Sequence, residues 1–197
     1  MAVENTYVFV EAEAIGRLRL GLQDSVAEEA WTQDLGGSSN WIAMGNPGDW
    51  NAGFRLRDAK GRLTDMTWGS VLAESTTTQT PRLAFSSREF SGFQVAASVG
   101  GVDTYAVAAF YSGTFGTVNV AAGMGYDLSR RQDALGSQAA GTGLTQAVLG
   151  RFVMSGSIFE SKSGLYGSAA ASEATSDISG RQGATNVYGK AGWKRDI

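Results

Sequence analysis

The sequence of 197 residues contains no cysteine, no histidine and only two prolines. Without cysteine and histidine the chain has no disulfide, no Ser-His-Asp or Cys-His nucleophile and no structural zinc site of the usual kind. The formal net charge of −3 lacks the basic excess that nucleic-acid binding needs. We therefore expect a protein that is not an enzyme and that does not bind nucleic acid.

Long hydrophobic runs are also missing. The longest unbroken apolar run covers residues 105–111, well short of the roughly 18 residues that a membrane-spanning helix needs. The first ten residues have no basic start, and Glu4, Glu11 and Glu13 interrupt the apolar residues around them. The sequence therefore predicts neither a transmembrane helix nor a signal peptide.

What the sequence has instead is a two-residue alternation, clearest between residues 7 and 23. Aliphatic residues occupy the even positions of 8–12 and 18–22, and charged residues stand at odd positions among them. This alternation predicts two strands, each with one apolar and one polar face. A turn at residues 14–16 folds them into a hairpin that groups opposite charges on one face and aliphatic side chains on the other. The expected pairs are Glu13 with Arg17, Glu11 with Arg19, Ala12 with Leu18, Val10 with Leu20 and Val8 with Leu22.

Turns that contain Gly or Ser separate further strand patterns along most of the chain. Residues 128–143 and 173–183 are expected to be long loops, and a short helical turn is expected within 25–34 or 130–140. The sequence thus predicts an all-β antiparallel meander of about ten strands. The further expected strands are residues 82–88, 92–99, 103–112, 117–126, 145–160, 165–172 and 185–193, with short ones within 53–58 and 66–72.

The apolar faces favour a membrane wall over a soluble core. They are built largely from Ala, Val and Gly, and aromatic residues gather near the strand ends, where membrane-interface girdles lie. The strands reach the roughly 9–11 residues that cross a bilayer, and short and long connections alternate. A soluble sandwich alternates in the same way, so a soluble β-sheet binding or adhesion protein stays as the alternative. The expected interface aromatics are Tyr7, Phe9, Tyr105, Tyr111, Tyr126 and Trp193.

Four short segments, in the expected order, resemble Gram-negative outer-membrane porins of the general-diffusion, alphaproteobacterial type. Residues 15–25 resemble an early hairpin strand of that family, and residues 48–57 resemble the segment that follows it. Residues 85–94 are similar to a later porin hairpin, although Arg88 stands where the family usually has proline. Residues 189–193 are similar to a late strand.

The resemblance implies both a fold and a function. The fold is a transmembrane β-barrel, sixteen-stranded in the family, of which this chain would be an incomplete or open fragment that lacks both ends. Residues 1–197 would then form one barrel segment with a long inserted region at 26–80. The implied function is passive diffusion of small hydrophilic solutes and ions through a water-filled channel. The implied setting is the lipid bilayer of the outer membrane of a Gram-negative bacterium, with the chain in a homotrimer.

Charged side chains on the polar faces are the candidate pore lining, because charged rings set the selectivity of a narrow channel. The candidates are Glu11, Glu13, Arg17, Arg19, Arg55, Arg57, Arg82 and Arg88. The resemblance further implies that part of 26–80 folds into the barrel as a constriction loop whose acidic residues face the arginines. The acidic candidates are Asp49, Asp58, Asp65 and Glu74. Ordinary exposed ion pairs and solvated loop charges would give the same pattern.

No cofactor is expected from the motifs. The segment Gly123-Met124-Gly125 lacks the third glycine of a dinucleotide-binding loop. Aspartates such as Asp127 and Asp133 lack the spacing of an EF-hand, although the resemblance leaves Ca²⁺ at the loops open. The sequence specifies no solute or ion preference.

Overall fold

The computed structural model describes residues 5–37, 53–67, 80–101, 104–129, 149–176 and 183–194. Most of these residues form antiparallel strands, which confirms the all-β prediction. No helix in this part of the chain is long and apolar enough to cross a membrane. The elements in chain order are β1 Thr6–Ala12, β2 Gly16–Gln23, α1 Val26–Trp31, β3 Arg55–Arg57, β4 Leu63–Thr67, β5 Thr80–Ser87, β6 Phe93–Gly100, β7 Thr104–Phe115, β8 Val118–Ser129, β9 Leu149–Glu160, β10 Leu165–Ser176 and β11 Ala184–Trp193.

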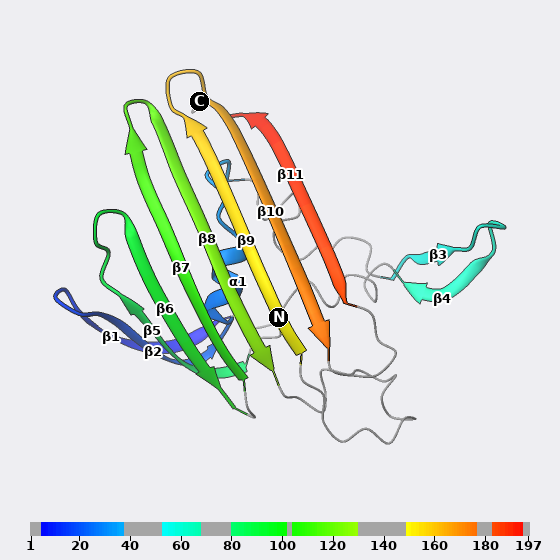
Figure 1. Ribbon diagram of the computed structural model, residues 1–197, viewed down its shortest axis with the longest axis horizontal. Coiled ribbons are helices and arrows are strands. Elements are labelled where there is room, and N and C mark those ends of the chain that lie inside the picture. The colour runs from blue at the N-terminus through cyan, green and yellow to red at the C-terminus, as the bar shows by residue number, and fades with distance from the viewer. Residues whose placement is uncertain are drawn as a thin grey trace.

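Nine of the strands form one sheet in the order β1-β2-β5-β6-β7-β8-β9-β10-β11 (Figure 1), and β3 and β4 form a separate hairpin. Every neighbouring pair is antiparallel. Among the described strands β1 and β11 each pair on one side only, so the sheet is open. The meander is confirmed. A closed barrel is not part of the described structure.

Several strands are longer than the sequence predicts. β7 and β8 continue until Phe115 pairs with Val118, so the turn lies at Gly116 and Thr117 rather than at residues 113–116. β10 runs to Ser176, into the segment expected to be a loop. The helical turn expected within 25–34 is α1, and the alternative at 130–140 lies outside the described residues.

The pairing of β1 with β2 corrects the expected hairpin register. Ala12 pairs with Gly16, and Glu11 with Arg17, so the turn is centred on Ala14 and every pair is displaced by two residues. A hydrogen bond closes the turn: the Ile15 N–H donates to the Ala12 carbonyl at 2.9 Å. A displacement of two keeps each side chain on its face, so the division into an apolar and a polar face survives although the predicted pairs do not.

Most of the large apolar side chains of the nine-stranded sheet lie on one face, which we call the outer face. Cross-strand pairs such as Leu20 with Leu83, Val107 with Tyr126 and Met124 with Met154 continue this face from strand to strand. Its large side chains are exposed, with 58% of Leu20 and 57% of Val107 accessible. They are Val8, Val10, Leu18, Leu20, Leu83, Phe85, Phe93, Val95, Val99, Tyr105, Val107, Phe115, Met124, Tyr126, Phe152, Met154, Ile158, Leu165, Val187 and Trp193.

The opposite, inner face of the sheet holds α1 and the buried residues. Figure 1 shows α1 behind the strands, and it packs against β6 to β10. Ser25 begins the helix, because its Oγ accepts from the Glu28 backbone N–H and satisfies a free N-terminal donor. The buried apolar cluster between helix and sheet consists largely of small side chains: Val26, Ala27, Ala30, Trp31, Ala84, Ala96, Ala106, Ala108, Val153 and Ala170.

Two glycines of β8 form the seat of α1. A Cβ added to Gly125 would lie 2.7 Å from the Ala27 Cα, and one added to Gly123 would lie 2.7 Å from the Ala30 carbonyl oxygen. Both contacts are with the helix itself, so no side-chain rotation relieves them. The pair Gly123 and Gly125, which resembles part of a nucleotide loop in the sequence, therefore allows close helix–sheet contact.

Replacing a seat glycine is expected to destabilise the fold. Gly125→Ala should lower the free energy of unfolding by about 1–3 kcal/mol, because the added methyl overpacks the contact with Ala27. Gly156→Ala is the matched control on β9, since its Cβ would meet only the Ala121 carbonyl oxygen at 3.8 Å. The control should be neutral or slightly stabilising. Denaturant unfolding curves of the two variants test this, and an equal loss in both would contradict the helix seat.

Candidate functional site

The candidate site is the inner face together with α1 and the segment 32–37, called here the strap. Arg17 and Arg19 lie on this face at the β1–β2 side. Arg17 pairs with Glu11 at 2.8 Å, and its guanidinium carbon lies 5.0 Å from the centre of the Phe9 ring. Both members of this pair are about half exposed, so we assign it 0–1 kcal/mol. Its geometry is that of an exposed surface pair.

Arg19 forms its ion pair with α1. Its two terminal nitrogens donate to the two carboxylate oxygens of Glu29, at 2.5 and 3.1 Å. This bidentate geometry is the strong form of an arginine–carboxylate contact. The Tyr7 ring lies 5.7 Å from the Arg19 guanidinium carbon. Arg19 therefore attaches the helix to the second strand of the sheet.

Arg151 of β9 is the most enclosed cation of the site. Its NH2 group donates to Glu28 at 2.6 Å and to Asp127 of β8 at 2.8 Å. Only 3% of the Arg151 side chain is exposed. Removing one member of a buried ion pair typically costs about 3–5 kcal/mol, because the remaining charge stays buried. The pair thus holds α1 firmly over β8 and β9.

Lys190 of β11 clamps the strap at the other side of the sheet. Its Nζ lies 2.6 Å from Asp34 Oδ2, and 1% of the Asp34 side chain is exposed. Asp34 Oδ1 accepts from Ser168 Oγ at 3.0 Å and from the Gly36 backbone N–H at 2.9 Å. Burial alone would raise the pKa of Asp34, but these donors and the charge of Lys190 outweigh it and hold the pKa below its ordinary value.

Serine hydroxyls of β9 bind the backbone of the strap. The Gln33 and Leu35 N–H groups donate to Ser155 Oγ at 3.1 Å and to Ser157 Oγ at 3.0 Å. Ser155 Oγ in turn donates to the Ala30 carbonyl at 2.5 Å. The two bound N–H groups are two residues apart, as are the two serines. Side-chain hydroxyls therefore satisfy the strap backbone where no strand lies beside it.

The contacts of this arrangement are mainly electrostatic. Three cations of the inner face, Arg19, Arg151 and Lys190, meet carboxylates of α1, the strap and β8, and each of these carboxylates accepts a hydrogen bond from its cation. Among the described residues no group of three or more acidic side chains is placed to hold a metal ion.

Four of the eight predicted pore-lining residues lie on the inner face. Arg17, Arg19 and Glu11 are there, and so is buried Arg82, whose carbonyl accepts from Gln23 Nε2 at 3.1 Å. The predicted contacts of Glu11 with Arg19 and of Glu13 with Arg17 do not form, because the hairpin register differs by two residues.

The other four predicted lining residues are elsewhere. Glu13 lies in the β1–β2 turn and Arg88 follows β5, both exposed. Arg55 and Arg57 are on β3, in the hairpin that is separate from the sheet. The inner face thus receives fewer of the predicted cations than the alternation suggested, because only strands of the large sheet contribute to it.

Two of the acidic candidates have partners close by in the sequence. Asp58 and Asp65 pair with Arg62 and Arg55 inside the β3–β4 hairpin, and their place in a constriction stays a prediction. Asp49 and Glu74 lie outside the described residues. The carboxylates that meet cations of the inner face are Glu11, Glu28, Glu29, Asp34 and Asp127.

The predicted interface aromatics divide between the two faces. Tyr105 and Tyr126 lie on the outer face at the end of the long connections, and Tyr111 and Trp193 lie on it at the end of the short turns. Tyr7 and Phe9 are a correction, because strand alternation places them on the inner face beside Arg19 and Arg17. The interface role itself stays a prediction.

Sequence reasoning missed several residues of the site. A signal for Glu28 existed, because Ser25 and Glu28 have the spacing of a capping box and so mark the start of a helix with acidic residues. Nothing local in the sequence indicates that Asp34 meets Lys190, which is 156 residues away. Asp127 and Arg151 are directly paired across β8 and β9, and only the register brings them together.

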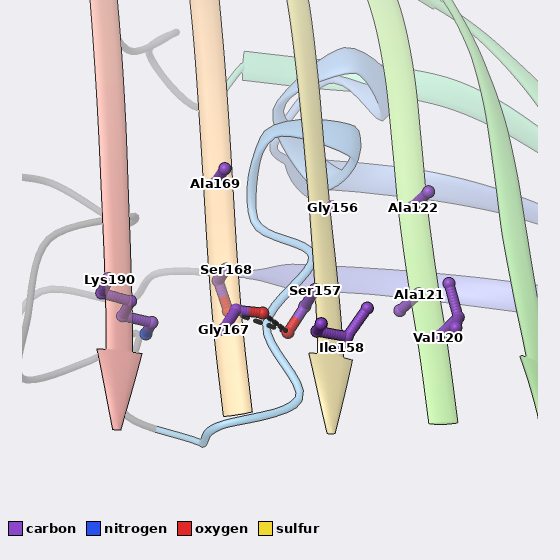
Figure 2. Close-up of a pocket in the computed structure, with 10 residues that line it drawn as sticks. All are labelled: Val120, Ala121, Ala122, Gly156, Ser157, Ile158, Gly167, Ser168, Ala169 and Lys190. Atoms are coloured by element: carbon purple, nitrogen blue, oxygen red, sulfur yellow. Dashed lines mark hydrogen bonds between the residues drawn. The ribbon is translucent and has the colours of Figure 1, made fainter. Parts of the chain in front are cut away.

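A shallow hollow of about 410 Å³ opens over β8, β9 and β10. Figure 2 shows its lining, in which small residues such as Gly156, Gly167 and Ala169 lie among the strands. Ser157 Oγ lies 2.8 Å from Ser168 Oγ, beside the hollow. Small residues of both faces line this depression together with Lys190, whose Nζ is paired with Asp34.

Comparisons of the chain with protein-family models, with curated proteins and with solved structures return no match.

Acid is expected to release the strap clamp. The lowered pKa of Asp34 means that its contribution to stability is complete above the ordinary carboxyl pKa of about 4. That contribution is lost as the pH falls through the lowered value in the folded state. The free energy of unfolding should therefore fall on acidification more steeply for the parent chain than for Asp34→Asn.

Denaturant titrations at several pH values measure this difference. Asp65→Asn is the matched control, because Asp65 is fully exposed in the separate hairpin, and its pH profile should follow the parent. At neutral pH Asp34→Asn should cost about 3–5 kcal/mol, as for a broken buried pair. Parallel profiles for the parent and Asp34→Asn would contradict the clamp.

Proposed function

We propose that this chain is part of the wall of an outer-membrane channel of the porin type, through which small hydrophilic solutes and ions diffuse passively. The observation that carries the proposal is an inverted distribution of side-chain size and polarity. The large apolar side chains are exposed on the outer face, whereas the buried polar and charged residues include Arg82, Asp127 and Arg151. A soluble monomer rarely exposes an apolar patch of more than a few hundred Å².

The positions of the aromatic residues support the same reading. On the outer face Tyr105, Tyr126 and Phe152 lie towards one end of the strands, whereas Phe93 and Tyr111 lie towards the other, their ring centres 4.8 Å apart. The one row between them is aliphatic or small, with Val95, Ala109, Met124 and Met154 on β6 to β9. This is the order of a lipid-facing band between two aromatic girdles.

The open sheet constrains how such a wall closes. Nine strands that alternate in direction place β1 and β11 in the same direction, so these two edges cannot pair antiparallel with each other. In lipid an unpaired edge is not tolerated. An all-antiparallel barrel therefore needs an odd number of further strands, and the sixteen strands of the family that the sequence resembles meet this requirement.

Within the proposed channel the inner face is the lumen wall, and α1 with the strap is the segment that narrows it. The proposed lining residues on the sheet include Glu11, Arg17 and Arg82, together with Arg19, Arg151 and Lys190, which pair with Glu29, Glu28 and Asp34. No covalent step and no cofactor is involved. The proposed setting is a homotrimer in the outer membrane.

The proposal is tested by the medium in which the chain folds. Purified chain should acquire its β-sheet circular dichroism only with detergent micelles or bilayers, because the outer face needs an apolar solvent. Once folded it should migrate differently in detergent gels before and after heating. A monomer that folds cooperatively in detergent-free buffer would contradict the proposal and favour a soluble β-sheet binding protein.

A further inference from the structure

The β3–β4 hairpin stands apart from the nine-stranded sheet (Figure 1) and is closed by a well-ordered turn. Asp58 Oδ1 accepts from the backbone N–H groups of Lys60 and Arg62, each at 2.9 Å. Its Oδ2 accepts from the Arg62 side chain at 2.8 Å. These hydrogen bonds hold the pKa of Asp58 below its ordinary value, so the carboxylate that organises the turn is charged.

This ordered hairpin exposes large apolar side chains. Phe54 is 67% exposed, Met66 56% and Leu63 54%. A two-stranded hairpin is marginally stable in water unless it packs against something. Its exposed apolar side chains therefore suit an apolar partner or a membrane–water interface.

The hairpin also carries a local excess of positive charge. Four cations and two carboxylates lie between residues 53 and 67, which gives this segment a net charge of +2. The whole chain has 16 cations and 19 carboxylates, so the remaining residues carry a net charge of −5. Arg55 and Arg62 pair with Asp65 and Asp58. Among the described residues Arg57 and Lys60 have no carboxylate partner, although Arg57 NH1 donates to the Gly61 carbonyl at 2.6 Å.

We propose that this hairpin binds the anionic surface of a phospholipid bilayer. Phe54, Leu63 and Met66 enter the interface, and Arg57 and Lys60 lie against the lipid phosphates. The charge pattern selects this occupant, because an anionic surface repels the rest of the chain and attracts the hairpin. The inference rests on the proposed membrane location, but it does not require that the chain conducts solutes.

A single fluorophore tests the proposal, because the chain has no cysteine of its own. Met66→Cys carries an environment-sensitive dye in the hairpin, and Ala14→Cys carries it in the exposed β1–β2 turn. The full-length chain is folded in the presence of phosphatidylcholine vesicles with and without one third phosphatidylglycerol. The dye at position 66 should shift to the blue with the anionic vesicles only, and the dye at position 14 should respond equally to both.

Charge variants separate the role of the cations from that of the fold. Lys60→Gln should weaken binding about fivefold and Arg57→Gln/Lys60→Gln roughly twenty-fivefold, as expected for about 1 kcal/mol per cation. Arg57→Lys/Lys60→Arg keeps both charges and should bind like the parent. Lys162→Gln removes one exposed lysine from the β9–β10 turn and should leave binding unchanged.

Three results would overturn the proposal: an equal shift with both kinds of vesicle, an unchanged affinity of the double glutamine variant, or no shift with either vesicle. Failure of the proposed function is seen separately. In that case the chain folds in water without lipid, whatever the dye at position 66 reports.

Discussion

The register of nine antiparallel strands keeps every second side chain on the same face of the sheet from β1 to β11. Slipping one strand by a single residue would exchange its apolar and polar sides and would place arginine among leucines. The outer face, the seat of α1 and the ion pairs of the inner face all depend on this register. It is fixed by short turns at one end, by the outward row of aliphatic pairs and by cross-strand ion pairs such as that of Arg151 with Asp127.

α1 and the strap supply carboxylate partners to three cations of the inner face. Arg19, Arg151 and Lys190 each reach a carboxylate of this segment, and the serines of β9 bind its backbone. These contacts connect β2 at one side of the sheet to β11 at the other. Because burial of a charge is costly unless it is paired, the segment and the wall stabilise each other. The small alanine-rich contact beneath the helix complements this polar attachment.

Much of the fold could be predicted from alternation alone. The strands around Val95, Val107 and Met124 follow the expected pattern, because period two and a nearby turn residue are local signals. The faces of β1 and β2 were predicted correctly, although the pairs were not. The turn position decides the register, and Ala14 to Gly16 allowed two hairpins that differ by two residues and have the same faces.

The candidate site could be predicted only in part, because its contacts join residues far apart in the sequence. Alternation identified Arg17 and Arg19 as inner-face residues, but it could not show that Arg19 turns to Glu29. The acidic residues near Asp58 were assigned to the constriction because they lie in the long insertion. Asp65 and Asp58 pair with arginines of their own hairpin. A partner close in the sequence costs less loop-closure entropy than a distant one. The clamp of Asp34 on Lys190 has no local signal at all.

The central claim is that the outer face meets lipid while the inner face is covered by α1 and the strap. Single cysteines on β8 at Val120, Ala121, Ala122, Met124 and Tyr126 test it in the reconstituted chain with a lipid-soluble quencher and a water-soluble thiol reagent. The account predicts strong lipid quenching of labels at Val120, Ala122, Met124 and Tyr126. Between them, Ala121 should be shielded from lipid, because it lies on the inner face. Uniform water accessibility along the strand, or quenching without a two-residue period, would contradict the account.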